Sequence, residues 1–168
     1  MDTTILNFPK MNLKNISLMF LPFLLVSLSS CEDDLVKGCM DPISINYNPE
    51  AQADDGSCLY GGDNGSTTLV LAPEHHGEPI FSSASYKDSA FIKFNAVNFP
   101  GDDPSLYDLV VEGEVGEEHV HVEDLKPGKY FVFMAGWDSS IAQRVSGGIP
   151  IVVTATSGEV EYPIPVTE

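Results

Sequence analysis

The sequence predicts an all-β protein whose main domain, residues 67–168, is an antiparallel β-sandwich of seven to eight strands. Apolar residues in this region occur in short stretches that often alternate with polar ones, the period of a strand with one buried face. The stretches are rich in β-branched and aromatic side chains, and no apolar stripe with the helical period exceeds two turns. Gly- and Pro-rich turn signals separate them, which is typical of strands joined by short connections.

Eight segments fit this pattern in chain order. The expected strands are 67–72, 80–85, 90–96, 107–112, 118–123, 129–136, 150–154 and 159–163. The expected turns are Pro100-Gly101-Asp102-Asp103, Lys126-Pro127-Gly128, Gly147-Gly148 and Ser157-Gly158. Pro presets the φ angle that turns need, and Gly permits positive φ, so these residues favour chain reversal. Strands at this spacing favour Greek-key-like connections.

Two further features assign strands and faces. The segment 131–135 is apolar at every position, so we expect a central strand that is buried on both faces. Trp137 follows this segment, and we expect its ring to close one end of the core. In 118–123, period-two alternation places Val120 and Val122 toward the core.

The four histidines raise the question of a metal site. The same alternation places His119 and His121 together on the solvent face of their strand, a geometry that Zn²⁺ or Cu²⁺ sites use. The alternative is two solvent-exposed side chains in an acidic chain. Adjacent His75 and His76 would point to opposite faces of a strand, so at most one of them could join that pair.

The stretch Leu125-Lys126-Pro127-Gly128-Lys129-Tyr130 resembles the LxPGxY corner of transthyretin-like and carboxypeptidase regulatory-like domains. The resemblance extends over residues 108–166 and implies an Ig-like or transthyretin-like sandwich. It further implies that Gly128 adopts positive φ after the proline and that Tyr130 packs back on the corner. Such domains serve stability, assembly or binding, and fold alone assigns no ligand.

Residues 1–30 have the features of a cleaved secretory signal helix. Lys10 and Lys14 precede an apolar run at 16–28, and small residues follow it. As a helix this run rises roughly 20 Å, which is short of the ~30 Å hydrocarbon core of a bilayer. The start could also be Met11, because the chain from there to residue 30 has every part of a compact signal.

The end of this signal, Leu28-Ser29-Ser30-Cys31, resembles the lipobox of bacterial lipoproteins. The resemblance implies that the Cys31 thiol is acylated, that the mature chain begins there, and that acyl chains hold the protein on a membrane. Residues 31–37 then form a tether. Its acidic run Glu32-Asp33-Asp34 is either a solvated spacer or, as it also resembles, the surface-export signal of some Gram-negative lipoproteins. We expect an outer-membrane location that faces the cell exterior.

Residues 38–60, GCMDPISINYNPEAQADDGSCLY, resemble a short module written GCxDPxAxNYxPxAxxDDGSC, with Ser44 in place of the usual Ala. The segment has too few apolar groups for a self-sufficient core, so a covalent staple is expected. Once Cys31 is acylated, Cys39 and Cys58 are left to pair with each other, and an oxidising compartment permits the bond.

The same module offers oxygen atoms that could bind a cation. Asp41, Asn46, Asp54 and Asp55 carry the hard ligands that Ca²⁺ prefers. Their spacing does not match a twelve-residue Ca²⁺ loop, and no bidentate Glu closes the set. Capping of the turns at Asp-Pro, Asn-Pro and Asp-Gly is therefore the favoured interpretation. No other cofactor is expected. Beyond the module, residues 61–66 have the composition of a flexible linker.

Composition and motifs limit the function. Eight Lys and Arg against 25 Asp and Glu give a formal net charge of −17, so the chain lacks the basic surface that nucleic acids require. The sequence contains neither a Gly-x-Ser-x-Gly elbow nor a His-Glu-x-x-His helix, and no phosphate-binding Gly loop. We therefore expect a non-catalytic binding or assembly module with an envelope protein or a glycan as partner. The alternatives are metal handling and, with less support, glycan hydrolysis.

Overall fold

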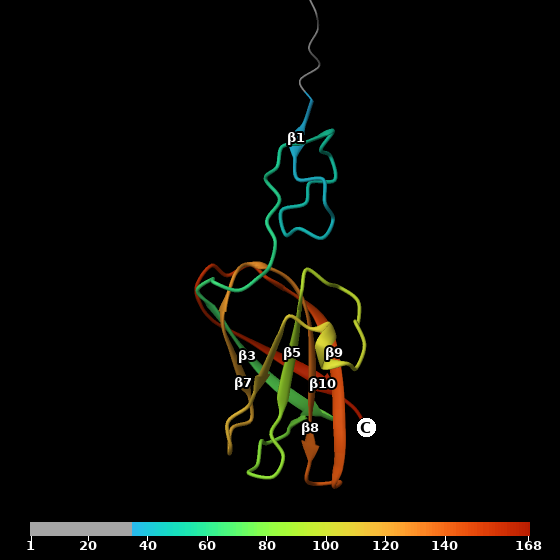
Figure 1. Cartoon of the computed structure of the whole chain (residues 1–168), viewed down its shortest axis with the longest axis vertical. Helices are drawn as coiled ribbons and strands as arrows, with labels where there is room; N and C mark the ends of the chain where they lie inside the picture. Colours follow the sequence, from blue (N-terminus) through green and yellow to red (C-terminus); the bar gives the residue numbers. More distant parts are fainter. Residues whose placement is uncertain (1–34) are drawn as a thin grey trace, which may run out of the picture. The chain divides into compact units, whose positions relative to one another are not determined.

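The computed structural model describes residues 35–168, and its architecture is the predicted all-β sandwich (Figure 1). The strands are β1 (Lys37–Gly38), β2 (Ala53–Asp54), β3 (Thr67–His75), β4 (Glu78–Pro79), β5 (Ser89–Phe94), β6 (Leu109–Glu112), β7 (Val120–Leu125), β8 (Gly128–Asp138), β9 (Gln143–Val153) and β10 (Gly158–Val166). A single 3₁₀ turn, η1 (Pro104–Leu106), precedes β6. The predicted signal peptide, Cys31 and the acidic run at 32–34 lie outside the described residues. Within residues 35–168, no helix is long and apolar enough to cross a bilayer.

Two sheets form the sandwich. One has the order β6-β5-β8-β9 and is antiparallel throughout. In the other, β3 pairs with β10 on one side, and with β7 and the short β4 on the other. The pair β3–β10 is parallel, unlike the other pairs of these sheets and unlike the wholly antiparallel sandwich that the sequence predicts. These are the first and last strands of the sandwich, so the chain between them supplies the long connection that a parallel pair needs.

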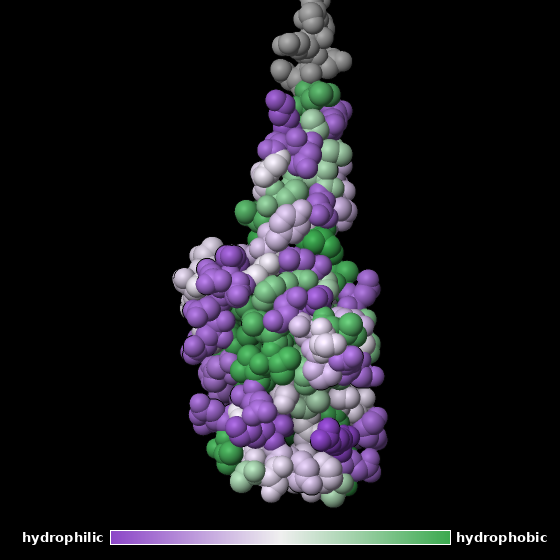
Figure 2. Space-filling view, in the orientation of Figure 1, coloured by the Kyte–Doolittle hydropathy of each residue, from purple (hydrophilic) through white to green (hydrophobic). Residues whose placement is uncertain are grey.

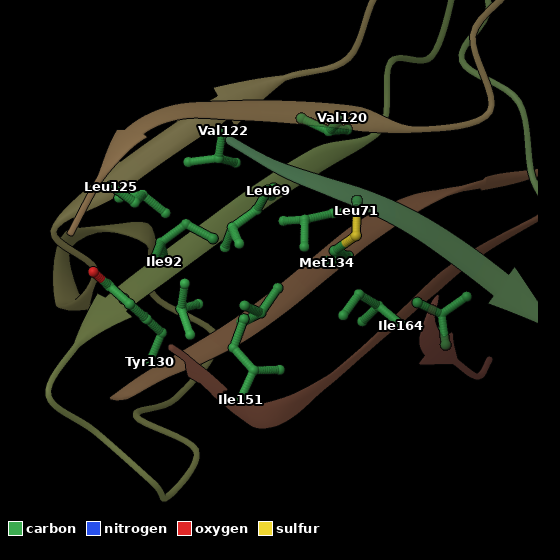
Figure 3. Packing of buried hydrophobic residues seen from close by; sticks show 14 of the residues in the cluster. Leu69, Leu71, Ile92, Val120, Val122, Leu125, Tyr130, Met134, Ile151 and Ile164 are labelled. Carbon is green, nitrogen blue, oxygen red and sulfur yellow. The ribbon is translucent and has the colours of Figure 1, made fainter. Parts of the chain in front are cut away.

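The core lies between the two sheets, where their inward residues interlock (Figure 3). The sheet with β3 contributes Leu69, Leu71, Val120, Val122, Leu125, Ile164 and Val166, and the facing sheet contributes Ile92, Tyr130, Val132, Met134, Ile151 and Val153. Each of these side chains is at most 5% exposed. Full burial of one Leu or Val contributes about 1.5–3 kcal/mol, so this cluster is the main source of the stability of the sandwich.

The predicted central strand is confirmed, because β8 pairs with β5 on one side and with β9 on the other. The strand predicted at 80–85 is wrong. The chain pairs with β3 only at β4, and beyond it Ile80 and Ser82 donate their backbone N–H groups to the carbonyls of Pro73 (3.0 Å) and Glu117 (3.1 Å). Both side chains are buried, and Ile80 belongs to the main core cluster, so the apolar pattern there results from burial without strand pairing.

The turn predicted at Gly147-Gly148 is also wrong, because β9 runs straight through both residues. A Cβ atom on Gly147 would lie 2.3 Å from the carbonyl oxygen of Pro165, and one on Gly148 would lie 2.4 Å from that of Val132. Close approach of backbones therefore requires these glycines. Beside them, the backbones of Ser146 and Thr167 exchange hydrogen bonds of 2.8 and 2.9 Å, which link β9 to the end of the other sheet.

The Pro-Gly corner carries the chain from β7 in one sheet to β8 in the other. Tyr130 packs back on it as predicted: its hydroxyl donates to the carbonyl of Lys126 (2.5 Å) and accepts from the N–H of Gly62 (2.9 Å). The predicted positive φ at Gly128 is wrong. The left-handed residue is Asp124, with φ 59°, in the bulge before the corner. Gly128 is required because a Cβ there would lie 2.1 Å from the Cα of Gly61.

The segment 61–66 lies against this corner, which differs from the flexible linker that its composition predicts. Gly61 exchanges two hydrogen bonds with the side chain of Asn95, of 2.8 and 3.1 Å. The carbonyl of Gly62 accepts from the N–H of Lys126 (2.9 Å), and Gly65 donates to Asp124 (2.7 Å). The N–H of Lys126 and the carbonyl of Asp124 thus find their partners in this segment.

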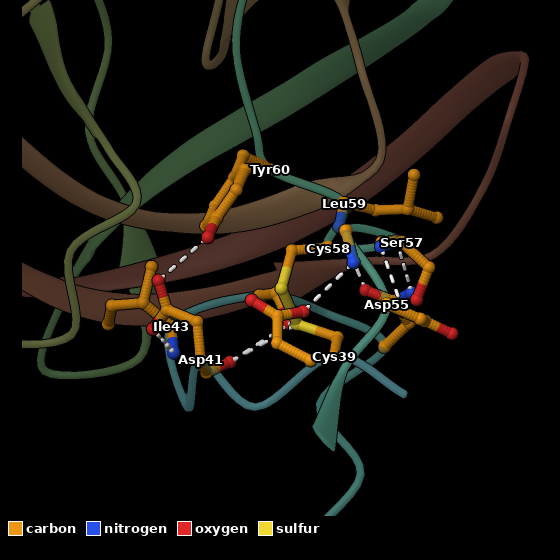
Figure 4. The surroundings of a disulfide bond; sticks show 12 residues. Cys39, Asp41, Ile43, Asp55, Ser57, Cys58, Leu59 and Tyr60 are labelled. Carbon is orange, nitrogen blue, oxygen red and sulfur yellow. Dashed lines mark hydrogen bonds between the residues drawn. A yellow bond between two sulfur atoms is a disulfide. The ribbon is translucent and has the colours of Figure 1, made fainter. Parts of the chain in front are cut away.

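The small module at residues 38–60 contains the predicted disulfide between Cys39 and Cys58 (Figure 4). The two Cα atoms are 4.8 Å apart, and Cys39 is 1% exposed. Regular structure is limited to the parallel pair β1–β2, and the N–H of Asn48 donates to the carbonyl of Cys39 (2.9 Å). Ser44 is fully buried, and its hydroxyl donates to the carbonyl of Asp41 (3.0 Å), which offsets the cost of burying it.

Candidate functional site

The outer face of the antiparallel sheet carries a layer of aromatic side chains. Strand alternation turns Tyr130, Val132 and Met134 of β8 toward the core, so Phe131 and Phe133 point the other way. The strand register aligns Phe133 with Phe91 of β5, and Phe91 with Val110 of β6. Figure 2 shows the resulting hydrophobic patch on the side of the sandwich that carries β5 in Figure 1.

The connection between β5 and β6 covers only part of this layer. Its Tyr107 lies against Phe91 and Phe133, with ring centroids 5.5 and 6.1 Å apart, and Phe99 lies 5.3 Å from Phe133. Burial raises the pKa of Tyr107 to about 12, while its hydroxyl donates to the carbonyl of Gly101 (2.9 Å). Tyr107 therefore stays neutral and fixes the edge of the exposed aromatic surface.

A groove of about 680 Å³ opens on the uncovered part of this face. Its floor includes Phe91, Phe133 and Trp137, one aromatic residue from β5 and two from β8. Trp137 stacks on Tyr86 with ring centroids 4.4 Å apart and an angle of 11° between the rings. Trp137 belongs to neither buried cluster, so the prediction that it closes the end of the core is wrong.

Polar side chains line the rim of the groove. Lys87 and Glu112 form an ion pair of 3.4 Å at one side, with both side chains well exposed. Arg144 stands beside Trp137 in the register of β8 and β9, and Asp102 lines the groove from the connection before β6. An exposed pair such as Lys87 and Glu112 contributes little to stability.

A second group of chemically active side chains lies at one end of the sandwich. His75, the last residue of β3, is 4% exposed and occupies an inward position of its strand. Its Nδ1 lies 2.7 Å from Oδ2 of Asp138, and its Nε2 lies 2.8 Å from Oε2 of Glu168. Asp138 ends β8 and Glu168 follows β10, so three strands deliver one residue each to this point.

Hydrogen bonds set the charges of this group. The hydroxyl (2.6 Å) and N–H (2.7 Å) of Ser140 donate to Oδ1 of Asp138 and, with His75, lower the pKa of Asp138 to about 2. Asp138 and then Glu168 raise the pKa of His75 by hydrogen bonding to its ring. The backbone N–H of Glu168 and the ring of His75 lower the pKa of Glu168. Two carboxylates thus hold one imidazole between them.

His76 joins this group through the shape of its turn. His76 and Gly77 have φ values of 55° and 83°, which identify the tight β3–β4 turn as a two-residue type I′ hairpin. The prediction that the two rings point to opposite faces is wrong, because it assumed an extended chain. The left-handed conformation turns the ring of His76 onto that of His75, with centroids 4.1 Å apart and 24° between the planes.

In the predicted pair, His121 is an exposed residue of β7 and His119 lies just before the strand, while Val120 and Val122 are buried, as expected. The two rings are 4.8 Å apart in an edge-to-face arrangement, and Nε2 of His119 lies 3.7 Å from Oε2 of Glu117. Metal binding by this pair stays a prediction.

Three of the four predicted Ca²⁺ ligands of the small module, Asp41, Asp54 and Asp55, cap turns, and the fourth, Asn46, bonds to a distant residue of the module. Oδ1 of Asp41 accepts from the N–H of Ile43 (2.9 Å), and Oδ1 of Asn46 accepts from that of Leu59 (2.8 Å). In the same way, Asp54 accepts from the N–H of Gly56 (3.0 Å), and Asp55 from that of Ser57 (2.9 Å). The bonds of Asp41, Asp54 and Asp55 agree with the favoured interpretation, in which these side chains cap turns. Ca²⁺ binding stays a prediction.

Another buried carboxyl group lies near the end of the sandwich with no evident chemical role. Asp88 is 1% exposed, and its Oδ2 accepts from the hydroxyl of Ser82 (3.0 Å). Burial raises the pKa of Asp88, and the bond from Ser82 opposes this shift. A Cβ atom on Gly136 would lie 2.2 Å from Oδ1 of Asp88, so this glycine makes room for the carboxyl group.

Comparison of the chain with models of protein families, with curated proteins and with solved structures gives no match.

Proposed function

We propose that this chain is a lipid-anchored lipoprotein of the cell envelope whose β-sandwich is a non-catalytic binding module. The anchor is Cys31, on the strength of the Leu28-Ser29-Ser30-Cys31 sequence at the end of the apolar run. The acidic run that follows favours export to the outer surface of the outer membrane. Acyl chains on Cys31 tether the module to the membrane, with the ligand-binding face free for solutes or neighbouring molecules.

The groove on the outer face of β5 and β8 carries the binding part of the proposal. Monomeric proteins rarely expose a Trp, a Tyr and two Phe rings around one concavity unless these rings contact a ligand or a partner. Here Phe91, Phe133 and Trp137 line the groove, and Tyr86 stacks on Trp137 beside them. The charged and hydroxyl groups of the rim supply directional hydrogen bonds that would orient a ligand.

A glycan is the ligand class that this chemistry fits best. A sugar ring has an apolar face that can lie on an aromatic ring and hydroxyl groups that can bond to a polar rim. The net charge of −17 disfavours a polyanionic ligand, because the field of the whole chain repels it. The rim contains both signs of charge, Lys87 and Arg144 against Asp102 and Glu112, which suits a neutral polyhydroxyl compound.

Trp137 makes the proposal directly measurable, because it is the single tryptophan of the chain. We expect neutral oligosaccharides to change its fluorescence in a saturable way. We expect Trp137→Ala to weaken the same binding at least about tenfold when it is followed by calorimetry, since buried aromatic anchors dominate binding energy. The unfolding midpoint of Trp137→Ala should differ little from that of the unsubstituted chain, because Trp137 lies outside both core clusters.

Tyr47→Ala is the matched control, because Tyr47 is an exposed aromatic residue of the small module, outside the groove. The affinity of Tyr47→Ala for neutral oligosaccharides should equal that of the unsubstituted chain. Equal affinity in Trp137→Ala would remove the groove from the account, and a complete lack of response to a panel of neutral glycans would remove the glycan.

A further inference from the structure

The end of the sandwich brings together three side chains of the kinds that bind transition metals. His75, His76 and Glu168 each offer one ligand atom, and these atoms lie within 4.8 Å of one another. In the part of the chain that the structure describes, no other set of three His, Cys, Asp or Glu side chains meets this condition. The set has two imidazoles and one carboxylate, a combination that occurs in open zinc sites.

We propose that His75, His76 and Glu168 bind a divalent transition metal ion of the Zn²⁺ class. The ion would take the place of the proton in the hydrogen bond between Nε2 of His75 and Oε2 of Glu168, whose atoms are now 2.8 Å apart and must move further apart to ligate one ion. This proton leaves to solvent. The imidazole is then a neutral donor, and the carboxylate keeps its negative charge.

Asp138 is the positioning residue of the site. Its Oδ2 holds Nδ1 of His75 at 2.7 Å, so Nδ1 keeps its proton and Nε2 is the nitrogen presented to the ion. Ser140 fixes Asp138 in turn through its N–H and its hydroxyl. This carboxylate–imidazole arrangement is typical of zinc ligands, where the outer carboxylate sets both the tautomer and the orientation of the ring.

The turn of β3 and β4 and the adjoining cavity complete the site. The left-handed φ of His76 places its ring over that of His75 while leaving the side chain exposed to an incoming ion. A cavity of about 360 Å³ borders both rings and also contacts Asp138 and Ser140. It has room for a water molecule in the fourth position of a tetrahedral ion. Imidazole nitrogens favour Zn²⁺, Cu²⁺ or Ni²⁺ over Ca²⁺ or Mg²⁺.

Calorimetric titration of the full chain with Zn²⁺, and with Ca²⁺ for comparison, tests the site. We expect one equivalent of Zn²⁺ to bind and Ca²⁺ not to compete with it. His76→Asn and Glu168→Gln should each weaken Zn²⁺ binding at least about tenfold. Both variants should fold, because Asn tolerates the left-handed conformation and Gln keeps a hydrogen bond to His75. Their thermal unfolding in the absence of metal checks this.

The double variant His119→Ala, His121→Ala is the control, since it removes the other histidine pair from an exposed strand face. It should bind Zn²⁺ within about twofold of the unsubstituted chain. The control loaded with Co²⁺ should show the intense visible absorption of a tetrahedral site. His76→Asn loaded with Co²⁺ should not show this absorption. Loss of binding in the control alone, or unchanged binding in both site variants, would overturn the proposal. Trp137→Ala should leave Zn²⁺ affinity unchanged, so this test is separate from that of the groove.

Discussion

Replacing Tyr130 by alanine is expected to lower the free energy of unfolding of the sandwich by about 3–5 kcal/mol, as for other large aromatic residues in cores. Tyr130 is fully buried and packs edge-on against Phe94 with ring centroids 5.7 Å apart. Its removal leaves a cavity and also deprives the N–H of Gly62 of its partner. Urea unfolding followed by the fluorescence of Trp137 measures the change.

Tyr130→Phe separates the two contributions. The ring stays, so the loss should fall to about 1–3 kcal/mol, the cost of leaving the buried groups around the hydroxyl unsatisfied. Because the hydroxyl connects β8 to Lys126 and Gly62, faster amide exchange should be confined to the corner and the segment 61–66. If Tyr130→Phe is as stable as the parent chain, the corner does not depend on this hydroxyl.

Removing the disulfide by Cys39→Ser and Cys58→Ser is expected to destabilise the small module by roughly 3 kcal/mol. The two cysteines are 19 residues apart, and the figure follows from the entropy of closing a loop of that length. The amide of Asn48 donates to the carbonyl of Cys39. Because 1.4 kcal/mol corresponds to a tenfold change in an equilibrium constant, the hydrogen exchange of this amide should accelerate about a hundredfold. Hydrogen exchange resolved by NMR measures this.

Ser44→Ala is the matched control for the disulfide, because it changes a buried residue of the same module and leaves both cysteines in place. It removes one hydrogen bond to Asp41 and a contact of 2.8 Å with Sγ of Cys39, so its effect should stay within about 1 kcal/mol. A disulfide-free chain with unchanged exchange at Asn48 would show that the turn caps alone hold the module together.

Local patterns predicted the parts of the fold that depend on neighbouring residues. Alternation placed Val120 and Val122 in the core, and the apolar run at 131–135 identified the central strand β8. The predictions that failed depend on contacts between distant segments. Gly147 and Gly148 lie in a strand because Pro165 and Val132 leave no space for a side chain, a fact that no local pattern contains.

The groove could not be predicted because it depends on strand order. Phe91 and Phe133 are far apart in the sequence, and they meet only because β5 and β8 are neighbours in register. The prediction that Trp137 closes the core follows from its position after a buried strand, and it is wrong. The alternation of β8 puts Trp137 on the same outer face as Phe133, so a strict count of odd and even residues could have found it.

The same count offers a partial signal for the histidine site. In β3, His75 continues the inward series of Leu69 and Leu71, and in β8 Asp138 continues that of Met134. Polar residues at the last inward position of a strand indicate a polar end to the core. That Glu168 joins them requires the parallel register of β3 and β10, in which Val166 pairs with His75.

The mass of the mature chain isolated from membranes tests the lipid anchor most directly. We expect a chain that begins at Cys31 and carries acyl groups, with two fewer hydrogens than it would have if Cys39 and Cys58 were reduced. Labelling with palmitate should disappear in Cys31→Ser. A mature chain that begins elsewhere, or one that is released from the cell with a free thiol at Cys31, would contradict the account.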